Sequence, residues 1–258
     1  MELLNEAEGF LICTGAGMSS DSGVPIYRKN NTWGPLQEEL DQRYSGLLVE
    51  DIHDFGKSGL FQQKGELLWA YFRDLRQVFL SKPHSGYYGL NSLIRNKPYF
   101  VVTSNIDHMH VHSGLFPMNV VEAHGSLIDN RGNFRVQCSQ GIECNNRIWS
   151  SDEVLPRCPV CHLIARPNCL SFNDEHYFVT ENYSHDNMVL WLNSFRGRLA
   201  IFEIGVGTEV KTISNRSRGA WKDHPNSILF RINPTPDPEP LPMRYINLST
   251  TAKTAFTF

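Results

Sequence analysis

Four cysteines in the middle of the chain have the spacing of a metal-binding site. Cys138 and Cys144 form one pair, and Cys158 and Cys161 form a second pair after a gap of 13 residues. Two pairs of thiolates suit tetrahedral Zn²⁺, and four protein ligands leave no open position for a catalytic water molecule. The spacing therefore predicts a structural zinc ion. Two loose thiols or a redox pair are the alternatives.

A glycine turn near the N-terminus has the residues of a nucleotide-binding loop. An apolar run, residues 10–13, leads into Gly15, Ala16 and Gly17, and Ser19 follows. In the order strand, glycine turn and helix start, backbone N–H groups face a phosphate and glycine lets the backbone approach it closely. We expect these residues to bind a nucleotide. Many such turns carry glycines without binding any ligand, so that alternative stays open.

The same segment lacks the features of an ordinary dehydrogenase. Ser20 stands where the GxGxxG motif has its third glycine, and no acidic residue follows a clear second strand about twenty residues on. Instead, Pro25 is followed by Tyr27 and Arg28, an aromatic ring and a cation that suit a loop covering a dinucleotide. We therefore predict that Tyr27 and Arg28 contact the nucleotide.

Three polar side chains follow two other apolar runs. Asn105 and Asp107 come after residues 99–103, and His124 comes after residues 119–121. Open α/β sheets bind ligands at the carboxyl ends of their strands. There, Asn105 could orient a water molecule or a ribose hydroxyl, and Asp107 could bind a carboxamide or a developing cation. His124 has the side chain best matched to proton transfer near pH 7. A turn in which Asn105 and Asp107 bind their own backbone is the alternative.

A second glycine turn lies in the C-terminal half of the chain. Gly205, Gly207 and Thr208 follow one apolar run, and Asn233 ends another. Both positions are strand ends, where the second half of a dinucleotide could lie.

The elements that must position these residues alternate between strands and helices. Amphipathic patterns predict three helices, and in the first of them Leu68, Phe72, Leu75 and Phe79 share one face. The helices are expected at residues 65–80, 85–95 and 185–195. Buried parallel strands are expected at residues 10–13, 99–103, 119–121, 200–204 and 228–232, with a last strand near residues 244–247. The alternation predicts an α/β fold with a Rossmann-like, doubly wound parallel sheet.

One segment breaks this alternation. Residues 132–172 hold the four paired cysteines, short β-like pieces and few helix signals. We predict that residues 1–258 form a single catalytic domain with residues 132–172 as a small inserted zinc-ribbon module. The proline-rich residues 234–242 predict an extended loop, because proline suits neither a helix interior nor a central strand.

Composition limits the possible partners. Of 258 residues, 41% are hydrophobic and the net charge is −3, so bulk electrostatics give no reason to expect direct binding of nucleic acid. No apolar run approaches the roughly 18 residues of a membrane span. The first predicted strand begins about nine residues from the start, which leaves no room for a signal peptide. We expect an intracellular protein, in the cytoplasm, without membrane contact.

Taken in order, these motifs resemble the sirtuin family of NAD-dependent protein deacylases, of which this chain looks like a divergent member. GAGMSSDSGVPIYR resembles the family's GAGxSxxSGIPxFR, and TSNIDHMH is similar to TQNIDxLH. EAHGS resembles the stretch that holds the catalytic histidine, and the four cysteines follow where the zinc ribbon belongs. ARPNCLSFNDEHY, GVGTEV and INP are similar to later family segments. The resemblance spans about residues 9–235.

The resemblance implies a role for each of these residues. NAD would be consumed as a co-substrate, bound in the cleft between the Rossmann core and the zinc module. Asn105 and Asp107 would bind its nicotinamide end, and His124 would act as general base toward a ribose hydroxyl. The remaining cofactor-binding residues would be Gly15, Ala16, Gly17, Ser19, Tyr27, Arg28, Ser104, Gly205, Gly207, Thr208 and Asn233.

The chain departs from the family pattern at several positions. Ser104 replaces a glutamine, Tyr27 replaces a phenylalanine, and Glu209 replaces a serine near the expected adenosine ribose. Residues 172–174 replace Phe-Gly-Glu, and residues 211–213 stand where a peptide-clamping loop would run. These last two segments are expected to pair with a substrate peptide by strand addition.

The resemblance leaves more than one function open. The first is an NAD-dependent protein-lysine deacylase (deacetylase), which cleaves the nicotinamide–ribose bond and transfers the acyl group of a protein or peptide to ADP-ribose. The alternative is a sirtuin-like protein ADP-ribosyltransferase, with an ADP-ribose acceptor protein as partner, or an NAD hydrolase. A third is an NAD-sensing module without turnover. His124 favours the first, because relatives that lack deacylation can lack this histidine.

Two arginines bear on the acyl group. Arg73 and Arg76 lie three residues apart on a predicted helix, near where some sirtuins carry a Tyr-x-x-Arg pair that recognises acidic acyl groups. The tyrosine of that pair is absent. We expect Arg73 and Arg76 to form a solvated helix face.

Overall fold

Six parallel strands form the main sheet, as the apolar runs predict. The computed structural model describes residues 2–26, 42–44, 46–47, 54–57, 59–144, 147–174, 176–178, 183–208 and 210–257. The strands are β1 (Gly9–Thr14), β2 (Tyr99–Thr103), β3 (Val120–Glu122), β7 (Leu199–Ile204), β8 (Ser227–Ile232) and β9 (Tyr245–Leu248). Their order across the sheet is β3-β2-β1-β7-β8-β9, and every pair is parallel. The order reverses beside β1, as in a doubly wound fold, so the predicted fold class is confirmed.

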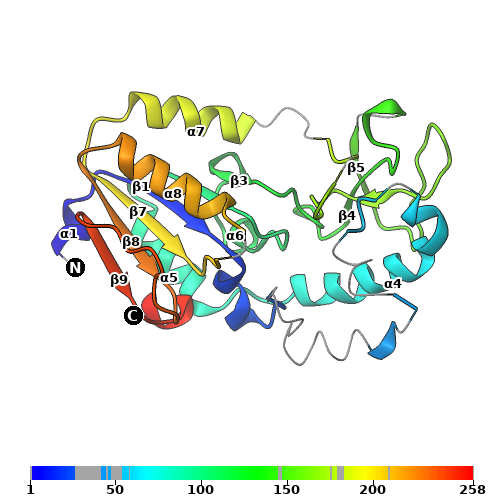
Figure 1. The fold of residues 1–258 in the computed structure, drawn as a ribbon, viewed down its shortest axis with the longest axis horizontal. Helices are drawn as coiled ribbons and strands as arrows, with labels where there is room; N and C mark the ends of the chain where they lie inside the picture. The colour runs from blue at the N-terminus through cyan, green and yellow to red at the C-terminus, as the bar shows by residue number, and fades with distance from the viewer. Residues whose placement is uncertain are drawn as a thin grey trace.

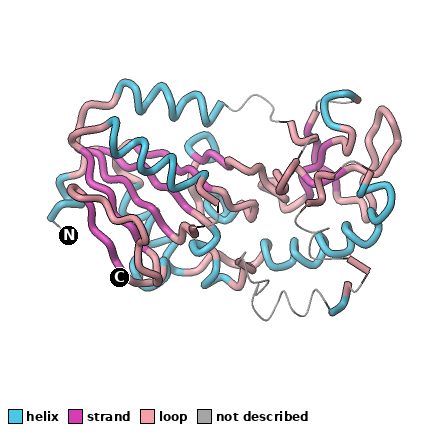
Figure 2. The backbone as a smooth tube through the Cα atoms, in the orientation of Figure 1, coloured by secondary structure: helices cyan, strands magenta, loops and turns pink. Residues whose placement is uncertain are grey.

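Helices cover both faces of this sheet. On one face lie α1 (Glu2–Glu6), α5 (Ser85–Ile94) and α9 (Ala252–Ala255), and on the other lie α7 (Tyr183–Ser194) and α8 (Thr212–Asp223) (Figure 1). Side chains alternate along a strand, so Phe10 and Ile12 of β1 pack toward α5, whereas Leu11 and Cys13 pack toward α7 and α8. Figure 2 shows the strands as one layer between these helices. Within the described residues, none of the helices has both the length and the apolar character that crossing a bilayer requires.

A second, smaller sheet lies at the other end of the molecule. It is antiparallel and has the order β5-β4-β6, with β4 (Phe134–Gln137), β5 (Ile148–Ser151) and β6 (Arg166–Pro167). The long helix α4 (Leu60–Phe79) lies beside it (Figure 1). Trp69 of α4 is fully buried, stacks edge-on against Phe134 and donates a 2.8 Å hydrogen bond to the carbonyl of Ala165. Residues from before the second strand therefore share a core with the cysteine-rich segment.

The interpretation of Arg73 and Arg76 as a solvated helix face is wrong for Arg76, whose hydrogen bond is partly buried, whereas the hydrogen bond of Arg73 is exposed to solvent. Arg73 donates a 2.7 Å hydrogen bond to the carbonyl of Val154, and Arg76 donates one of 2.6 Å to the carbonyl of Gly132. The Arg76 guanidinium also lies 4.8 Å from the centre of the Phe134 ring. The small sheet covers this side of α4, so both cations fix the helix to the module.

The segment after the first glycine turn also differs from expectation. In place of an α-helix the chain makes two short 3₁₀ turns, η1 (Ala16–Met18) and η2 (Ser20–Ser22). The Ser20 hydroxyl donates to the carbonyl of Gly17, and Gly23 adopts a left-handed φ of 84° that ends the second turn. The other short elements are α6 (Met109–His112), η3 (Pro117–Asn119) and η4 (Gly141–Glu143). Residues 234–242 form the predicted loop between β8 and β9.

A buried ion pair joins β6 to the segment that follows it. The Arg166 guanidinium donates hydrogen bonds of 2.7 and 2.5 Å to the two carboxylate oxygens of Asp174. Their side chains are 1% and 0% exposed. Asp174 also accepts hydrogen bonds from the backbone N–H groups of Ser171 and Tyr177. Burial alone would raise the pKa of Asp174, but Arg166 and these donors outweigh it, so the pKa lies below its ordinary value.

We expect Asp174→Asn to lower the free energy of unfolding by about 3–5 kcal/mol at pH 7, because it leaves the buried Arg166 charge uncompensated. The lowered pKa means that Asp174 contributes fully above about pH 4 and loses its contribution as the pH falls toward the folded-state pKa. The variant should therefore lose this part of the acid dependence. Urea unfolding at several pH values measures both effects.

The matched control is Asp186→Asn, because the Asp186 side chain is 70% exposed. This change should alter the unfolding free energy by less than about 0.5 kcal/mol. Equal unfolding midpoints for Asp174→Asn and the unchanged protein would show that the ion pair does not stabilise this segment.

Candidate functional site

A cavity of about 500 Å³ opens where the strands of the main sheet end. Because β1, β2 and β7 pair in register up to Thr14, Thr103 and Ile204, their carboxyl ends lie side by side. The loops that follow these strands form one wall, and α4 with residues 170–173 forms the other. Seven of the predicted site residues line the cavity: Gly15, Ala16, Ser104, Asn105, Asp107, His124 and Gly207.

Other predicted site residues lie elsewhere. Tyr27 and Arg28, as well as Glu209, fall outside the residues that the structure describes. Four more are buried or half-buried and do not line the cavity: Gly17, Ser19, Gly205 and Asn233. Thr208 is exposed beside the cavity.

The apolar wall is the part of the site that the sequence patterns do not assign. Tyr71, Phe72, Leu75 and Phe79 of α4 face the cavity, together with Ile106 of the opposite wall. The sequence does carry a pattern at these positions, because Phe72, Leu75 and Phe79 belong to the predicted amphipathic face of that helix. A core-facing stripe and a ligand-facing stripe have the same periodicity, so the pattern alone could not separate them.

The two glycine turns touch each other. The N–H of Gly17 donates a 3.0 Å hydrogen bond to the carbonyl of Gly205, whose own φ is +60°. A Cβ atom on Gly17 would lie 2.7 Å from the Gly205 Cα, and one on Gly15 would lie 2.8 Å from its carbonyl oxygen. Asn233 holds the second turn from behind by donating a 2.8 Å hydrogen bond to the carbonyl of Val206. Gly17 and Gly205 are therefore required by backbone packing.

Ser19 is buried in a network below the cavity floor. Its hydroxyl donates to the Asp107 carboxylate at 2.5 Å and accepts from the Asn105 amide at 2.9 Å. The Tyr87 hydroxyl lies 2.8 Å away and must be a donor, because the single proton of Ser19 is already used. The Ser19 hydroxyl is thus saturated and fully buried, so it orients Asn105 and Asp107 and leaves no atom for a phosphate.

Asp107 is a carboxylate whose ionised form is disfavoured. Burial raises its pKa, and its hydrogen bonds from Ser19 and from the Met109 N–H oppose that rise only in part. The same burial, together with the charge of Asp107, raises the pKa of Tyr87. Tyr87 therefore keeps its proton for Ser19.

His124 lies at the cavity edge on the loop after β3. Burial lowers its pKa, and a contact with the backbone of Ser104 opposes this only in part, so the imidazole is neutral near pH 7. Its Nε2 atom is 3.4 Å from the Thr212 hydroxyl. Gly125, which follows, has a left-handed φ of 73°, and a Cβ there would lie 2.2 Å from the Asn168 carbonyl oxygen. That close approach to the module fixes where His124 can lie.

One expectation for the cavity rim is wrong. Residues 211–213 do not form an extended peptide-pairing segment, because α8 begins at Thr212. Both Thr212 and Ile213 line the cavity as residues of the first helical turn. On the opposite rim, Leu170 and Phe172 are 39% and 43% exposed, so an apolar surface is still available there.

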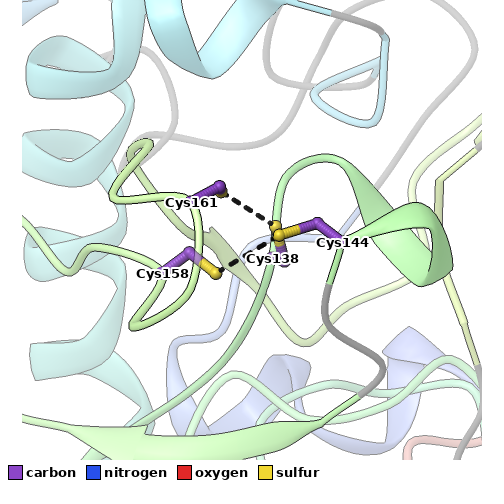
Figure 3. A group of neighbouring side chains, drawn as sticks. All are labelled: Cys138, Cys144, Cys158 and Cys161. Carbon is purple, nitrogen blue, oxygen red and sulfur yellow. Dashed lines mark hydrogen bonds between the residues drawn. The ribbon is translucent and has the colours of Figure 1, made fainter.

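The four paired cysteines converge, as their spacing predicts (Figure 3). Their Sγ atoms all lie within 4.8 Å of one another, with Cys138 and Cys161 at 3.7 Å and Cys144 and Cys158 at 3.9 Å. Tetrahedral Zn²⁺ with Zn–S bonds of about 2.3 Å requires S···S separations of about 3.8 Å. The donor set therefore fits a structural zinc ion. Backbone N–H groups of Gln140 and Val160 point at two of the sulfurs, as suits thiolates.

Chelation of the metal or the change Cys158→Ser should lower the melting temperature by about 10 °C, because a loss of several kilocalories per mole has that effect in a chain of this size. Differential scanning calorimetry measures the shift, and added Zn²⁺ should reverse the effect of the chelator. The chelator should have no further effect on Cys158→Ser. Unchanged melting in both experiments would argue against structural zinc.

Comparison with known sequences agrees with this geometry. The model of the Sir2 family matches residues 15–189. An NAD-dependent protein deacylase of Thermus thermophilus is 27% identical over 258 residues, covering 96% of this chain and 88% of that protein. An NAD-dependent protein deacylase 2 of Pseudomonas syringae pv. tomato is 31% identical over 175 residues, covering 66% of this chain and 65% of that protein.

Solved structures share the fold. A Sir2 homolog in complex with NAD superposes with a TM-score of 0.71 at 21% identity and covers 99% of this chain and 89% of its own. A Sir2 complex with a p53 peptide and NAD⁺ has a TM-score of 0.64 at 19% identity, with 98% and 92% covered. Since the family model matches well over half of the residues, this chain belongs to the Sir2 family, the sirtuins.

Proposed function

We propose that this chain is an NAD-dependent protein-lysine deacylase that uses His124 as its general base. The observation that carries the proposal is the neutral His124 imidazole in the same cavity as Asn105 and Asp107. The deacylase names of the relatives from Thermus thermophilus and Pseudomonas syringae support it. An acylated protein or peptide would be the partner.

The cavity lining fits a dinucleotide. Gly15 and Ala16 present backbone with little side chain in the way, as close approach of a phosphate requires. Asn105 and Asp107 are held by Ser19, so their remaining polar atoms are preorganised for the carboxamide of the nicotinamide end. When bound, NAD supplies the ADP-ribose that accepts the acyl group as nicotinamide leaves.

His124 then has one task, which is to take a proton from a ribose hydroxyl. A base must be unprotonated to do so, and burial secures this by lowering the pKa of His124. The acyl-lysine would enter over the apolar rim at Leu170 and Phe172 and place its acyl oxygen near the ribose. Asp174, paired with Arg166, fixes this rim by accepting a hydrogen bond from the N–H of Ser171.

A second candidate is ADP-ribosyl transfer to a protein, or hydrolysis of NAD. The helical start of α8 favours it, because an extended edge for pairing with a peptide is absent at Thr212 and Ile213. Both candidates use the same nucleotide cavity and differ only in the acceptor of ADP-ribose.

Product analysis separates these candidates. The protein is incubated with NAD and an acetylated peptide library, and the products are followed by mass spectrometry. We expect O-acyl-ADP-ribose together with free nicotinamide. Free ADP-ribose without peptide, or a protein that gains ADP-ribose, would favour the second candidate. Binding of NAD without any release of nicotinamide would leave only a sensing role.

We expect His124→Ala to reduce deacylation by about 10²- to 10⁴-fold, the range for loss of a general base, while NAD affinity changes little. Turnover assays and calorimetric titration with NAD measure the two effects. His162→Asn is the control, since His162 is exposed on the zinc module and asparagine tolerates its left-handed backbone, so both values should stay unchanged. Retained deacylation in His124→Ala would remove His124 from this role.

A further inference from the structure

A second histidine, His108, lies just outside the cavity between the two segments that carry the site. It directly follows Asp107, and its backbone has a left-handed φ of 61°, which is uncommon for a residue with a Cβ atom. The residue is 8% exposed and does not line the cavity of about 500 Å³ that holds Asn105, Asp107 and His124. A buried side chain held in a sparsely populated conformation calls for a specific set of partners.

Both ring nitrogens of His108 face oxygen atoms. Nδ1 lies 2.7 Å from the Glu122 carboxylate, and Nε2 lies 2.6 Å from the side-chain oxygen of Asn130. A neutral imidazole has one N–H and satisfies only one of these acceptors, whereas an imidazolium satisfies both. The arrangement therefore favours the charged ring.

Glu122 is the other end of this bridge, and its place in the chain gives the bridge a consequence. Glu122 ends β3 two residues before His124, and its second oxygen lies 3.6 Å from the guanidinium of Arg135. His108 and Glu122 line a separate cavity of about 350 Å³ that Ala123 and Gly125 also line. The bridge thus joins the Asp107 segment to the His124 segment from outside the cavity.

We propose that His108 is a positioning residue, which as an imidazolium bound to Glu122 and Asn130 holds Asp107 and His124 at their working separation. The proposal rests on the deacylase function proposed above. His108 touches neither nucleotide nor acyl-lysine and acts through its neighbours in the chain.

The surroundings of His108 agree with a charged ring. Burial lowers its pKa, but the hydrogen bond and charge of Glu122 and the bond to Asn130 outweigh burial, so the pKa is raised above the usual value. Arg135 of β4 opposes this rise. The other groups near the ring or its partner are His112, whose ring centre is 5.1 Å away, together with Asp107 and Asp129.

The bridge between His108 and Glu122 depends on pH. A raised folded-state pKa means that the bridge is fully present below about pH 6.5 and is lost as the pH rises through the raised value. His124 has the opposite shift and becomes an active base already below its usual pKa. Activity should therefore rise as His124 loses its proton and fall again, at higher pH, as His108 loses its own.

The test compares His108→Asn and Glu122→Gln with the unchanged protein. Asparagine tolerates the left-handed backbone but carries no charge, and glutamine keeps the shape of Glu122 without its charge. We expect kcat/KM for NAD to fall on the order of tenfold in each variant near pH 7, because the reaction slows when the reacting groups are misplaced. The alkaline fall in activity should disappear in His108→Asn. His162→Asn, another left-handed but exposed histidine, should keep the whole profile.

Two further measurements keep the test independent of turnover and of folding. NMR titration of the His108 ring should give a pKa above 6.5 in the unchanged protein and a lower one in Glu122→Gln, which has its carboxylate removed. Calorimetry should show that NAD affinity weakens at alkaline pH only where His108 is present. A ring that is neutral at pH 6, or a His108→Asn variant with unchanged kcat/KM and alkaline limb, would overturn the proposal. Absence of nicotinamide release from the unchanged protein would instead refute the proposed function, and the NMR and affinity data would still decide on His108.

Discussion

The close backbone approach of the two glycine turns at the ends of β1 and β7 is the constraint on which the site depends. A Cβ atom on Gly17 or Gly205 would lie 2.3–2.7 Å from the backbone of the other turn. This contact lets β1 and β7 end side by side at the point where the strand order reverses. Gly15, Ala16 and Gly207 can then face one cavity. The glycines that look most like phosphate ligands in the sequence therefore divide into one set that faces the cavity and another set that makes the turn possible.

The sequence predicts well whatever depends on local pattern. The apolar runs at β1, β2 and β7 are buried on both faces and lie within a residue of their observed bounds, because a central parallel strand is apolar on both sides. Asn105, Asp107 and His124 line one cavity for a related reason, since the ends of adjacent parallel strands must meet at one edge. The convergence of the four cysteines likewise followed from ligand spacing.

What the sequence could not give depends on contacts between distant segments. Ser19 looked like a phosphate ligand, and only its distances to Asp107 and Tyr87 show that its hydroxyl is already used. Arg76 looked solvated because nothing local indicates that Phe134 and Gly132 cover that side of α4. The family pattern predicts a peptide-pairing segment at Thr212, whereas α8 begins there and its first turn packs beside the cavity.

Burial alone does not decide the charge of the site's histidines; the partners do. His124 and His108 follow neighbouring strands, and both lose hydration. His124 meets a hydroxyl and a backbone group, so burial prevails and its pKa falls. His108 meets a carboxylate, so the charged form prevails and its pKa rises. One base and one cation are thus available together near neutral pH from the same residue type.

The zinc module contributes to the site through the wall that it supports. Cys138 directly follows β4, which pairs with β6, and Arg166 of β6 holds Asp174 in the segment that ends the apolar rim. These contacts pack the wall of the cavity that includes Phe172 against the segment that holds the cysteines. A metal held by residues that do not line the cavity would then influence how the acyl-lysine is received without taking part in the chemistry. Because the module and α4 share one core around Trp69, the zinc site and the apolar wall of the cavity belong to one packed unit.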